Sequence, residues 1–426
     1  MFVSQPMQLP LFEPPEPSAD DWTFSGAPTR SLTHCYHDYP ARMIPQIAAK
    51  LLERFAPQPA RLFDPYCGTG TSLVEGLIRG HEVHGTDLNP LARLISRAKL
   101  TPIPLAELDA ALADLAAWLR APVRTPQALP TGIDLTFWFQ PYAIEQLAHV
   151  QTWIAALHNA SLRAFFEVAF SETVRACSNT RIGEFKLYRL PPHELADHTP
   201  NVFATLRAKL ARNRTGLISF LAAFAKAPRQ SSAAIHAFDS VQGIPPNLIA
   251  PESVQIVITS PPYGDSHTTV AYGQYSRLSA EWLGLPCAAQ VDRHLMGGKQ
   301  RKHLPNFNLP TLDVALQTIY AQQPKRALEV AAFYDDLRVS IQQVARSLAR
   351  QGVACYVVGN RKVKGVLLPT DQAVQYFFEQ VGFTHLATYY RTIPNKRMPQ
   401  RNSPSNRVGA TDATMTREAI VVIKKV

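Results

Sequence analysis

The chain has 426 residues, long enough for a large buried core, and its 46% hydrophobic content is ordinary for a globular protein. Lysine and arginine outnumber aspartate and glutamate by 43 to 33, so the net charge of +10 favours a polyanionic partner such as nucleic acid. The five cysteines form no CxxC pair and the 13 histidines show no clustered metal spacing, which argues against a disulfide framework and a catalytic metal.

Residues 1–30 carry six prolines and little periodicity, which predicts an extended, proline-rich tail. The tail lacks the basic and apolar regions of a signal peptide, and no apolar run in the chain approaches the roughly 20 residues of a membrane span. We therefore expect a cytoplasmic protein with no membrane partner. Within the tail, "QLPLF" from Gln8 to Phe12 resembles the peptide by which bacterial proteins dock on the replicative sliding clamp; an unspecific disordered tail is the alternative.

The next part of the chain alternates between helical and strand patterns at short intervals. An amphipathic helix is predicted over 41–55, a buried strand over 61–64, a glycine loop over 65–71, a helix over 72–80 and a second strand over 81–87. Such alternation is typical of a mostly parallel, doubly wound α/β sheet.

The alternation is then interrupted by residues 101–233, whose helical spacing predicts a helical insertion. Strand patterns resume afterwards, together with one long helix. The strands are predicted over 233–240, 254–260, 353–359, 383–390 and 418–424, and the helix over 325–350. The chain thus divides into the tail, a first sheet part over 31–100, the helical insertion, and a second sheet part over 234–426 that contains a further insertion over 264–323.

The glycine loop follows an acid, since Asp64 ends the first strand and Gly68 and Gly70 precede the next helix. Glycines there let a ligand approach the backbone, although a tight turn without a ligand would look the same. A second acid, Asp87, ends the second strand, where it would bind ribose hydroxyls or cap the following helix. Together the two acids indicate a nucleoside ligand whose other end is a zwitterionic amino acid.

The strand over 254–260 ends in Ser260-Pro261-Pro262-Tyr263. Two prolines end the hydrogen-bond ladder and leave carbonyl oxygens free to accept. A serine hydroxyl beside a proline carbonyl would accept both protons of an exocyclic amino group, and Tyr263 would stack on the base that carries it. The segment therefore predicts a site for a nucleobase.

Four motifs in consistent order resemble a known family. "HDYPARMIP", "FDPYCGTGTSLVEG", "GTDLNPLA" and "ITSPPY" are similar to the motifs of S-adenosylmethionine-dependent DNA amino-methyltransferases, in the form typical of N4-cytosine enzymes. The resemblance implies a Rossmann-like class I methyltransferase fold with a C-terminal antiparallel hairpin, with cofactor binding in 31–100 and catalysis in 234–426. The cofactor residues that it implies are Tyr39, Pro40, Asp64, Pro65, Cys67, Gly68, Gly70, Thr71, Asp87, Asn89 and Asp239. The catalytic residues are Ser260, Pro261, Pro262 and Tyr263.

The implied reaction is methyl transfer to N4 of cytosine in a specific duplex DNA sequence, with base flipping. Alternatives are N6-adenine methylation on the same scaffold, guanine-N2 methylation of RNA, and a DNA-binding protein without catalysis. Methylation at cytosine C5 would need a nucleophilic cysteine, and Cys287 lacks the accompanying motifs. A restriction endonuclease is a further expected partner.

Basic runs without acids are candidates for contacts with DNA phosphates. They lie over 205–229, 299–303 and 391–407, and an interleaved basic and aromatic stretch covers 179–192. Sequence readout is expected in the insertions 101–233 and 264–323.

Overall fold

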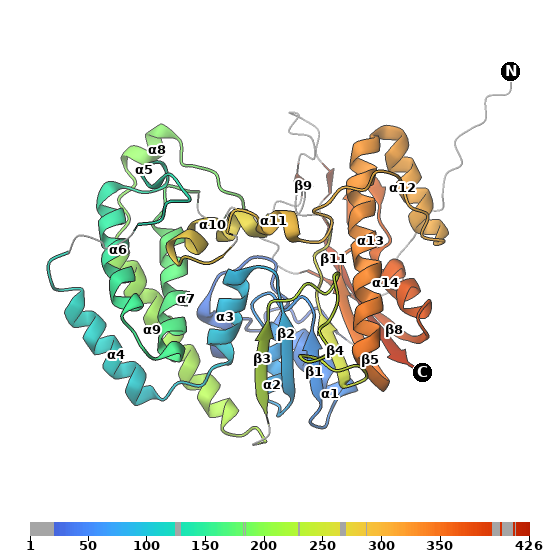
Figure 1. The fold of residues 1–426 in the computed structure, drawn as a ribbon, viewed down its shortest axis with the longest axis horizontal. Helices are drawn as coiled ribbons and strands as arrows, with labels where there is room; N and C mark the ends of the chain where they lie inside the picture. The colour runs from blue at the N-terminus through green and yellow to red at the C-terminus, as the bar shows by residue number, and fades with distance from the viewer. Residues whose placement is uncertain are drawn as a thin grey trace.

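The computed structural model describes residues 21–426 apart from 124–128, 182, 184, 229–230, 265–269, 287, 394–400, 403–411 and 414. The described chain forms a central sheet with helices on both faces and a helical unit beside one edge (Figure 1). Within these residues, no helix is both long and apolar enough to cross a membrane.

Seven strands form the central sheet, in the order β3-β2-β1-β4-β5-β11-β8. Their bounds are β1 Arg61–Asp64, β2 Glu82–Thr86, β3 Ser232–His236, β4 Val254–Thr259, β5 Leu348–Val358, β8 Phe383–Thr392 and β11 Arg417–Lys425. The first five strands in this order, β3, β2, β1, β4 and β5, pair in parallel. Strand β11 is antiparallel to both of its neighbours, β5 and β8. The predicted α/β fold, a mostly parallel sheet with a C-terminal antiparallel hairpin, is confirmed.

Both faces of the sheet are buried, as the alternation along β5 shows. Val353, Cys355 and Val357 belong to one hydrophobic cluster, whereas Ala354 and Tyr356 belong to the other. The first face is covered by α1 Pro45–Phe55, α2 Thr71–Leu77 and α3 Pro90–Leu100, and the second by α13 Pro324–Ser347 and α14 Thr370–Glu379. Helices therefore cover both faces of the central strands. Because side chains in the middle of these strands cannot reach a ligand, functional side chains must lie at the strand ends.

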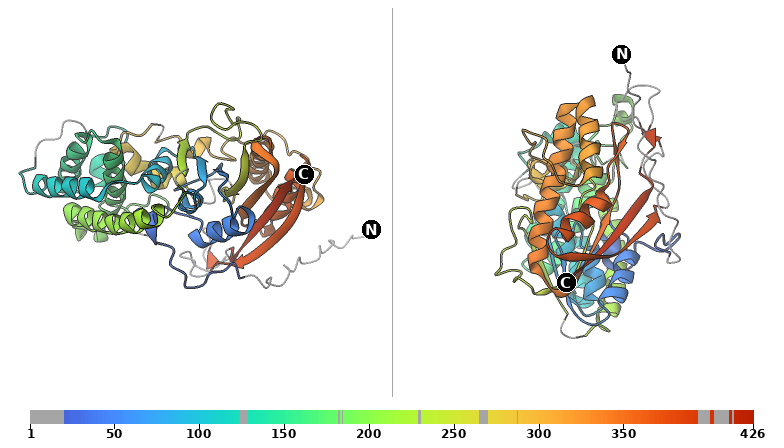
Figure 2. Two further views of the ribbon diagram at one scale, coloured as in Figure 1. Left: turned by 90° about the horizontal axis from the view of Figure 1, so that it is seen from below. Right: turned by 90° about the vertical axis from the view of Figure 1, so that its right-hand side faces the viewer.

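The insertion over 101–233 is helical, as predicted. It contains α4 Leu105–Trp118, α5 Leu135–Trp138, α6 Pro141–Ala155, α7 Ala160–Ala176, α8 Pro192–Ala196 and α9 Val202–Phe224. These helices form a unit beyond β3, as the two orientations in Figures 1 and 2 both show. The second insertion, over 264–323, contains α10 Tyr272–Trp282, α11 Val291–His294 and α12 Pro310–Gln322.

Several predicted boundaries were wrong, for local reasons. Helix α1 begins at Pro45 rather than at residue 41, because a proline suits the first helical position and keeps the residue before it extended. Strand β5 begins at Leu348, inside the predicted helix over 325–350, because Leu348 already pairs with Val254. Helix α14 and three short segments were not predicted. These segments are the 3-10 helix η1 Leu32–Tyr36, the pair β6 Lys362–Val363 with β7 Val366–Leu367, and the pair β9 Arg401–Asn402 with β10 Asp412–Ala413.

The predicted tail extends too far along the chain. Trp22 is 1% exposed and stacks on Tyr389 of β8 with 4.8 Å between the ring centroids. The Lys50 ammonium group lies 4.6 Å from the centroid of the Trp22 ring. The chain is thus attached to the sheet at Trp22. Burial of this large aromatic side chain is favourable, and a solvated, extended tail would leave it exposed to water. Gln8 to Phe12 lie outside the described residues.

Close packing of α2 on the sheet requires a glycine at position 76. A Cβ atom built on Gly76 would lie 2.8 Å from Leu62 Cδ2 and 2.8 Å from Val83 Cγ1. Gly76→Ala should therefore lower the free energy of unfolding by about 1–3 kcal/mol, although alanine is the better helix former. Urea denaturation measures the change, with Gln317→Ala on the exposed face of α12 as a control expected to stay within about 0.5 kcal/mol of wild type. Unchanged or raised stability of Gly76→Ala would contradict the packing described.

Candidate functional site at the carboxyl edge of the sheet

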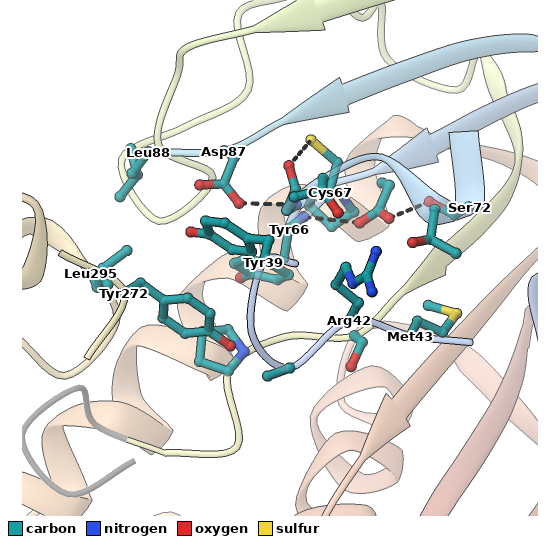
Figure 3. Close-up of a pocket in the computed structure, with 18 of the residues that line it drawn as sticks. Tyr39, Arg42, Met43, Tyr66, Cys67, Ser72, Asp87, Leu88, Tyr272 and Leu295 are labelled. Atoms are coloured by element: carbon teal, nitrogen blue, oxygen red, sulfur yellow. Dashed lines mark hydrogen bonds between the residues drawn. The ribbon is translucent and has the colours of Figure 1, made fainter. Parts of the chain in front are cut away.

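A cavity lies where β1, β2 and β4 end, and Figure 3 shows its lining. Most of the residues predicted to form the site line it: Tyr39, Pro40, Asp64, Pro65, Cys67, Gly68, Thr71, Asp87, Asp239, Ser260 and Pro262. The carboxyl edge of a parallel sheet is where ligands bind in such folds. The motifs that are far apart in the sequence therefore meet at one place.

Asp64, at the end of β1, is buried and joins three parts of the site. Its Oδ1 atom accepts hydrogen bonds from the Thr259 hydroxyl over 2.6 Å and from the Tyr66 amide over 3.0 Å, and its Oδ2 atom accepts from the Ser72 hydroxyl. Burial raises the pKa of Asp64 to about 6, against the opposing effect of these hydrogen bonds. The carboxylate thus connects the glycine loop to Thr259, the residue before Ser260.

The glycine loop has the open backbone that the sequence predicts. Gly68 and Gly70 have φ angles of 50° and 72°, and a Cβ atom built on Gly68 would meet no atom within 4 Å. Thr69 also lines the cavity, and its buried Oγ1 atom has no hydrogen-bond partner among the described residues. A buried hydroxyl without a partner is costly, so the loop is suited to a polar ligand. Gly70 itself does not line the cavity and forms the N-cap of α2.

Asp87, at the end of β2, fixes the other side of the loop. Its Oδ2 atom accepts from the Gly68 amide over 3.0 Å, and its Oδ1 atom accepts from the Asn89 amide over 2.7 Å. Burial raises the pKa of Asp87. Because the carboxylate also borders the cavity, it remains in position to meet a ligand hydroxyl.

Asn89 was predicted to bind the cofactor, but it does not line the cavity. It is buried, and its Oδ1 atom caps α3 by accepting from the Leu91 amide over 3.1 Å. Its Nδ2 atom donates to Tyr39 Oη over 2.8 Å and to Ser276 Oγ over 2.6 Å. Asn89 therefore holds Tyr39, which does line the cavity, and fills the cap position that favours asparagine.

The wall formed by Tyr39 includes two residues that were not among the predicted cofactor residues. Tyr272, from α10, stacks on Tyr39 with ring centroids 5.9 Å apart. Arg42 borders the cavity as well, and its Nη1 atom donates to the His34 carbonyl over 2.8 Å. Arg42 belongs to the quoted segment "HDYPARMIP", so a signal for it existed, whereas Tyr272 lies in an insertion without a recognisable pattern.

Lys99 supports the glycine loop from inside the protein and was also missed. Lys99 is 1% exposed, and its ammonium group donates to the Thr69 carbonyl over 2.7 Å. Burial, together with a smaller effect of the nearby Arg42 guanidinium, lowers the pKa of Lys99 to about 7. A lysine at the end of an amphipathic helix is usually exposed, so no local pattern predicts that Lys99 lies in the core.

Asp239 lines the cavity and is also a turn residue, so both interpretations of the sequence apply to it. Its Oδ1 atom accepts from the Val241 amide over 2.9 Å. Strand β3 ends at His236, short of the predicted residue 240, and the residues after it turn toward the cavity. The Phe238 carbonyl accepts from the Thr86 hydroxyl over 2.7 Å, which fixes this turn to β2.

The motif after β4 divides between two cavities. Ser260 and Pro262 line the first, while Pro261 is buried and lines neither. Tyr263 lines a second cavity of about 420 Å³, together with Glu418 and Arg391. Arg42 and Met43 border both cavities, so the two spaces are adjacent. The motif therefore stands between a space edged by the glycine loop and a space large enough for a base.

Several basic residues predicted to contact DNA form ion pairs with acids of the same chain. Lys209 and Arg212 contact Glu172, and Arg214 contacts Asp109 over 2.6 Å. From the other two runs, Arg301 pairs with Asp335 and Asp336, and Arg391 is 5% exposed and pairs with Glu418. Neighbouring acids neutralise these charges in the free protein, and contact between these residues and DNA phosphates stays a prediction. Lys299 and Lys302 remain exposed, and most of 391–407 lies outside the described residues.

The cysteines and histidines add no further chemistry in the described part of the chain. Burial raises the pKa of Cys67 well above its ordinary value, so the thiol in the glycine loop is a packing group. Cys287 lies outside the described residues. Among the residues that the structure describes, no group of three or more His, Cys, Asp or Glu side chains could hold a metal ion.

Comparison with known proteins gives relatives for nearly the whole chain. No family model matches it. The chain is 41% identical over 422 residues to the type II methyltransferase M.MvaI of Kocuria varians, covering 94% of this chain and 93% of the relative. It is 32% identical over 82 residues to the type II methyltransferase M.MjaII of Methanocaldococcus jannaschii, covering 19% and 16%.

Two solved methyltransferase structures have low similarity to the chain. An rRNA methyltransferase of Streptomyces viridochromogenes is 13% identical, with a TM-score of 0.32 and 91% and 86% of the two chains covered. A putative DNA modification methylase of Thermus thermophilus, in complex with S-adenosyl-L-methionine, is 20% identical, with a TM-score of 0.16 and 23% and 38% covered.

The raised pKa of Asp64 gives a prediction for stability. Between about pH 4 and pH 6 the unfolded chain has lost the Asp64 proton while the folded chain retains it, so this group makes stability fall as pH rises through that window. Asp64→Asn removes the titrating group. The asparagine carbonyl oxygen can still accept from the Thr259 hydroxyl and the Tyr66 amide if its NH2 group faces the Ser72 hydroxyl. The free energy of unfolding of the variant relative to wild type should therefore rise from pH 4.5 to pH 6.5 and then level off.

Urea denaturation across this pH range measures the difference. Asp197→Asn, which changes an exposed carboxylate outside the cavity, is the control. A difference between Asp64→Asn and wild type that stays constant with pH would show that Asp64 does not titrate as described.

Proposed function

Because the chain belongs to the type II DNA methyltransferases, we propose that it transfers a methyl group from S-adenosylmethionine to the exocyclic N4 amino group of cytosine in a specific duplex sequence. The observation that carries the proposal is that Ser260 and Pro262 line the same cavity as Asp64, Asp87 and the glycine loop. Methyl transfer needs the amino group and the cofactor in one place, and this cavity brings together the motifs suited to each.

The cofactor fits the chemistry of the residues that border the cavity. S-adenosylmethionine supplies an electrophilic methyl group on a sulfonium, and it carries an ammonium, a carboxylate and two ribose hydroxyls. Asp87 would accept from the ribose, while the open backbone at Gly68 and the unpartnered Thr69 hydroxyl would meet the amino-acid end. Tyr39 and Pro40 would wall the ligand, and Asp239 would lie near the adenine.

The target amino group would be activated by position. The N4 nitrogen is a weak nucleophile because its lone pair is delocalised into the ring. Hydrogen bonds from its two protons to Ser260 Oγ and the Pro261 carbonyl would favour a pyramidal nitrogen whose lone pair points at the methyl group. The bond from nitrogen to the methyl carbon would form as the carbon–sulfur bond breaks, leaving the sulfur as a neutral thioether, and the nitrogen would release one proton to solvent.

The base must leave the duplex to reach the two adjacent cavities, and Tyr263, which lines the second one, is the surface on which it would stack. Helices α5 and α8 on one side and α12 on the other extend beyond the carboxyl edge of the sheet (Figure 1). We assign DNA recognition to the insertions 101–233 and 264–323, which contain these helices. A restriction endonuclease specific for the same sequence is the expected partner.

Nucleoside analysis tests the proposal directly. The protein is incubated with duplex DNA and cofactor labelled in the methyl group, the DNA is digested to nucleosides, and the labelled nucleoside is identified. N4-methylcytosine is the expected product. Label in N6-methyladenine, or incorporation into RNA alone, would contradict the assignment of cytosine.

Ser260→Ala tests the role of the motif. Removing one acceptor of the amino group should lower the rate of transfer by about a hundredfold, the loss typical of one group that stabilises a transition state. Cofactor affinity, measured by calorimetry, should remain close to that of wild type. Transfer at the wild-type rate would show that Ser260 does not contact the amino group.

A further inference from the structure

The Tyr263 hydroxyl lies in the middle of a chain of hydrogen bonds that begins at Ser260. Ser260 Oγ is 3.2 Å from Tyr263 Oη, and Tyr263 Oη is 2.8 Å from Glu418 Oε1. An ionised carboxylate has no proton to donate, so Tyr263 must donate to Glu418. The single hydroxyl proton of Tyr263 is then engaged in the hydrogen bond to Glu418. In the contact between the two hydroxyls, Ser260 must therefore donate to Tyr263. The chain therefore has one direction, from Ser260 to the carboxylate.

Glu418 is held in place by a residue on the neighbouring strand. It lies directly across from Arg391 in the pairing of β11 with β8, and the two side chains form an ion pair. The Arg391 guanidinium is buried and also donates to the Trp22 carbonyl over 2.9 Å and to the Thr23 carbonyl over 3.3 Å. These additional acceptors satisfy a buried charge that would otherwise be costly. The carboxylate at the end of the chain is thus fixed in position.

We propose that Glu418 is a positioning residue for methyl transfer, which acts through Tyr263 to keep Ser260 Oγ a hydrogen-bond acceptor. The inference rests on the proposed function, since an exocyclic amino group has protons to donate and needs an acceptor. With its own proton directed to Tyr263, Ser260 presents lone pairs to the cavity that it lines. Hydrogen bonds in a series also polarise one another, which strengthens the outer ones.

Glu418→Gln reverses this chain while it conserves the shape of the side chain. The amide oxygen should face the Arg391 guanidinium, because a hydrogen bond to a charged donor is the stronger one. The amide NH2 group then faces Tyr263 Oη, so Tyr263 donates to Ser260 instead. The Ser260 proton is displaced into the cavity, toward the protons of the amino group.

Tyr263→Phe removes the middle of the chain. A phenylalanine ring still offers a surface for stacking, but residue 418 no longer influences the direction of the Ser260 hydroxyl. The substitution at 418 should therefore lose its effect when Tyr263→Phe is present. A residue that only stabilised the fold would give losses that multiply.

The experiment measures incorporation of labelled methyl into duplex DNA in a single turnover, at saturating cofactor. Glu418→Gln should slow transfer by about tenfold to a hundredfold, the factor expected for one mispaired hydrogen bond in a closed site. Tyr263→Phe should slow it less. The double variant should transfer at the rate of Tyr263→Phe alone, so the second substitution rescues the first.

Glu329→Gln is the matched control. The Glu329 side chain, on α13 and outside both insertions, is 21% exposed, against 14% for Glu418, and it pairs with Arg326 over 2.8 Å without lining either cavity. This variant should transfer at the wild-type rate. Incorporation is counted whichever nucleoside carries the label, so an adenine product would contradict the function proposed above and leave the comparison of variants intact.

Two results would overturn the inference. One is a wild-type rate in Glu418→Gln, and the other is a double variant slower than both single variants. Urea denaturation of each variant reports folding. If Glu418→Gln does not fold, Arg391→Met combined with Glu418→Met removes both buried charges together, and adding Tyr263→Phe should then bring transfer to the rate of Tyr263→Phe alone.

Discussion

The hydrogen bond between the Asp64 carboxylate and the Thr259 hydroxyl is the constraint on which the site depends. Strands β1 and β4 are neighbours in the sheet, and this bond joins their ends where the ladder between them stops. The same carboxylate accepts from Ser72 at the start of α2. The position of the glycine loop and the position of Ser260 are therefore not independent. A buried carboxylate is costly, and the raised pKa of Asp64 reflects that cost.

Large parts of the fold and of the candidate site could be predicted from the sequence, because they depend on local patterns. The strands have apolar runs bounded by glycine and proline, and the site residues next to them are placed by the rule that parallel strands end at one edge. Asp64, Gly68, Asp87 and Ser260 were found in this way and meet in one cavity.

The missed residues depend on contacts between distant segments. Tyr272 reaches the cavity from an insertion, and Glu418 reaches Tyr263 across 155 positions of the chain. Arg391 looked like a phosphate contact because it begins a basic run, whereas its partner Glu418 lies on another strand. No single-sequence pattern reports a pairing of this kind, since charge patterning counts neighbours along the chain rather than across the sheet.

In the proposed mechanism, Asp64 and Thr259 position the amino-group motif against the cofactor loop. Thr259→Val removes the hydroxyl at nearly constant volume, and the decisive measurement is its rate of methyl transfer to DNA in a single turnover with cofactor saturating. We expect a loss of about tenfold in rate and a decrease of about 1–3 kcal/mol in the free energy of unfolding, because the buried Asp64 carboxylate loses one donor, with cofactor affinity little changed. Transfer at the wild-type rate would contradict the account, because the two loops would then be positioned without this bond.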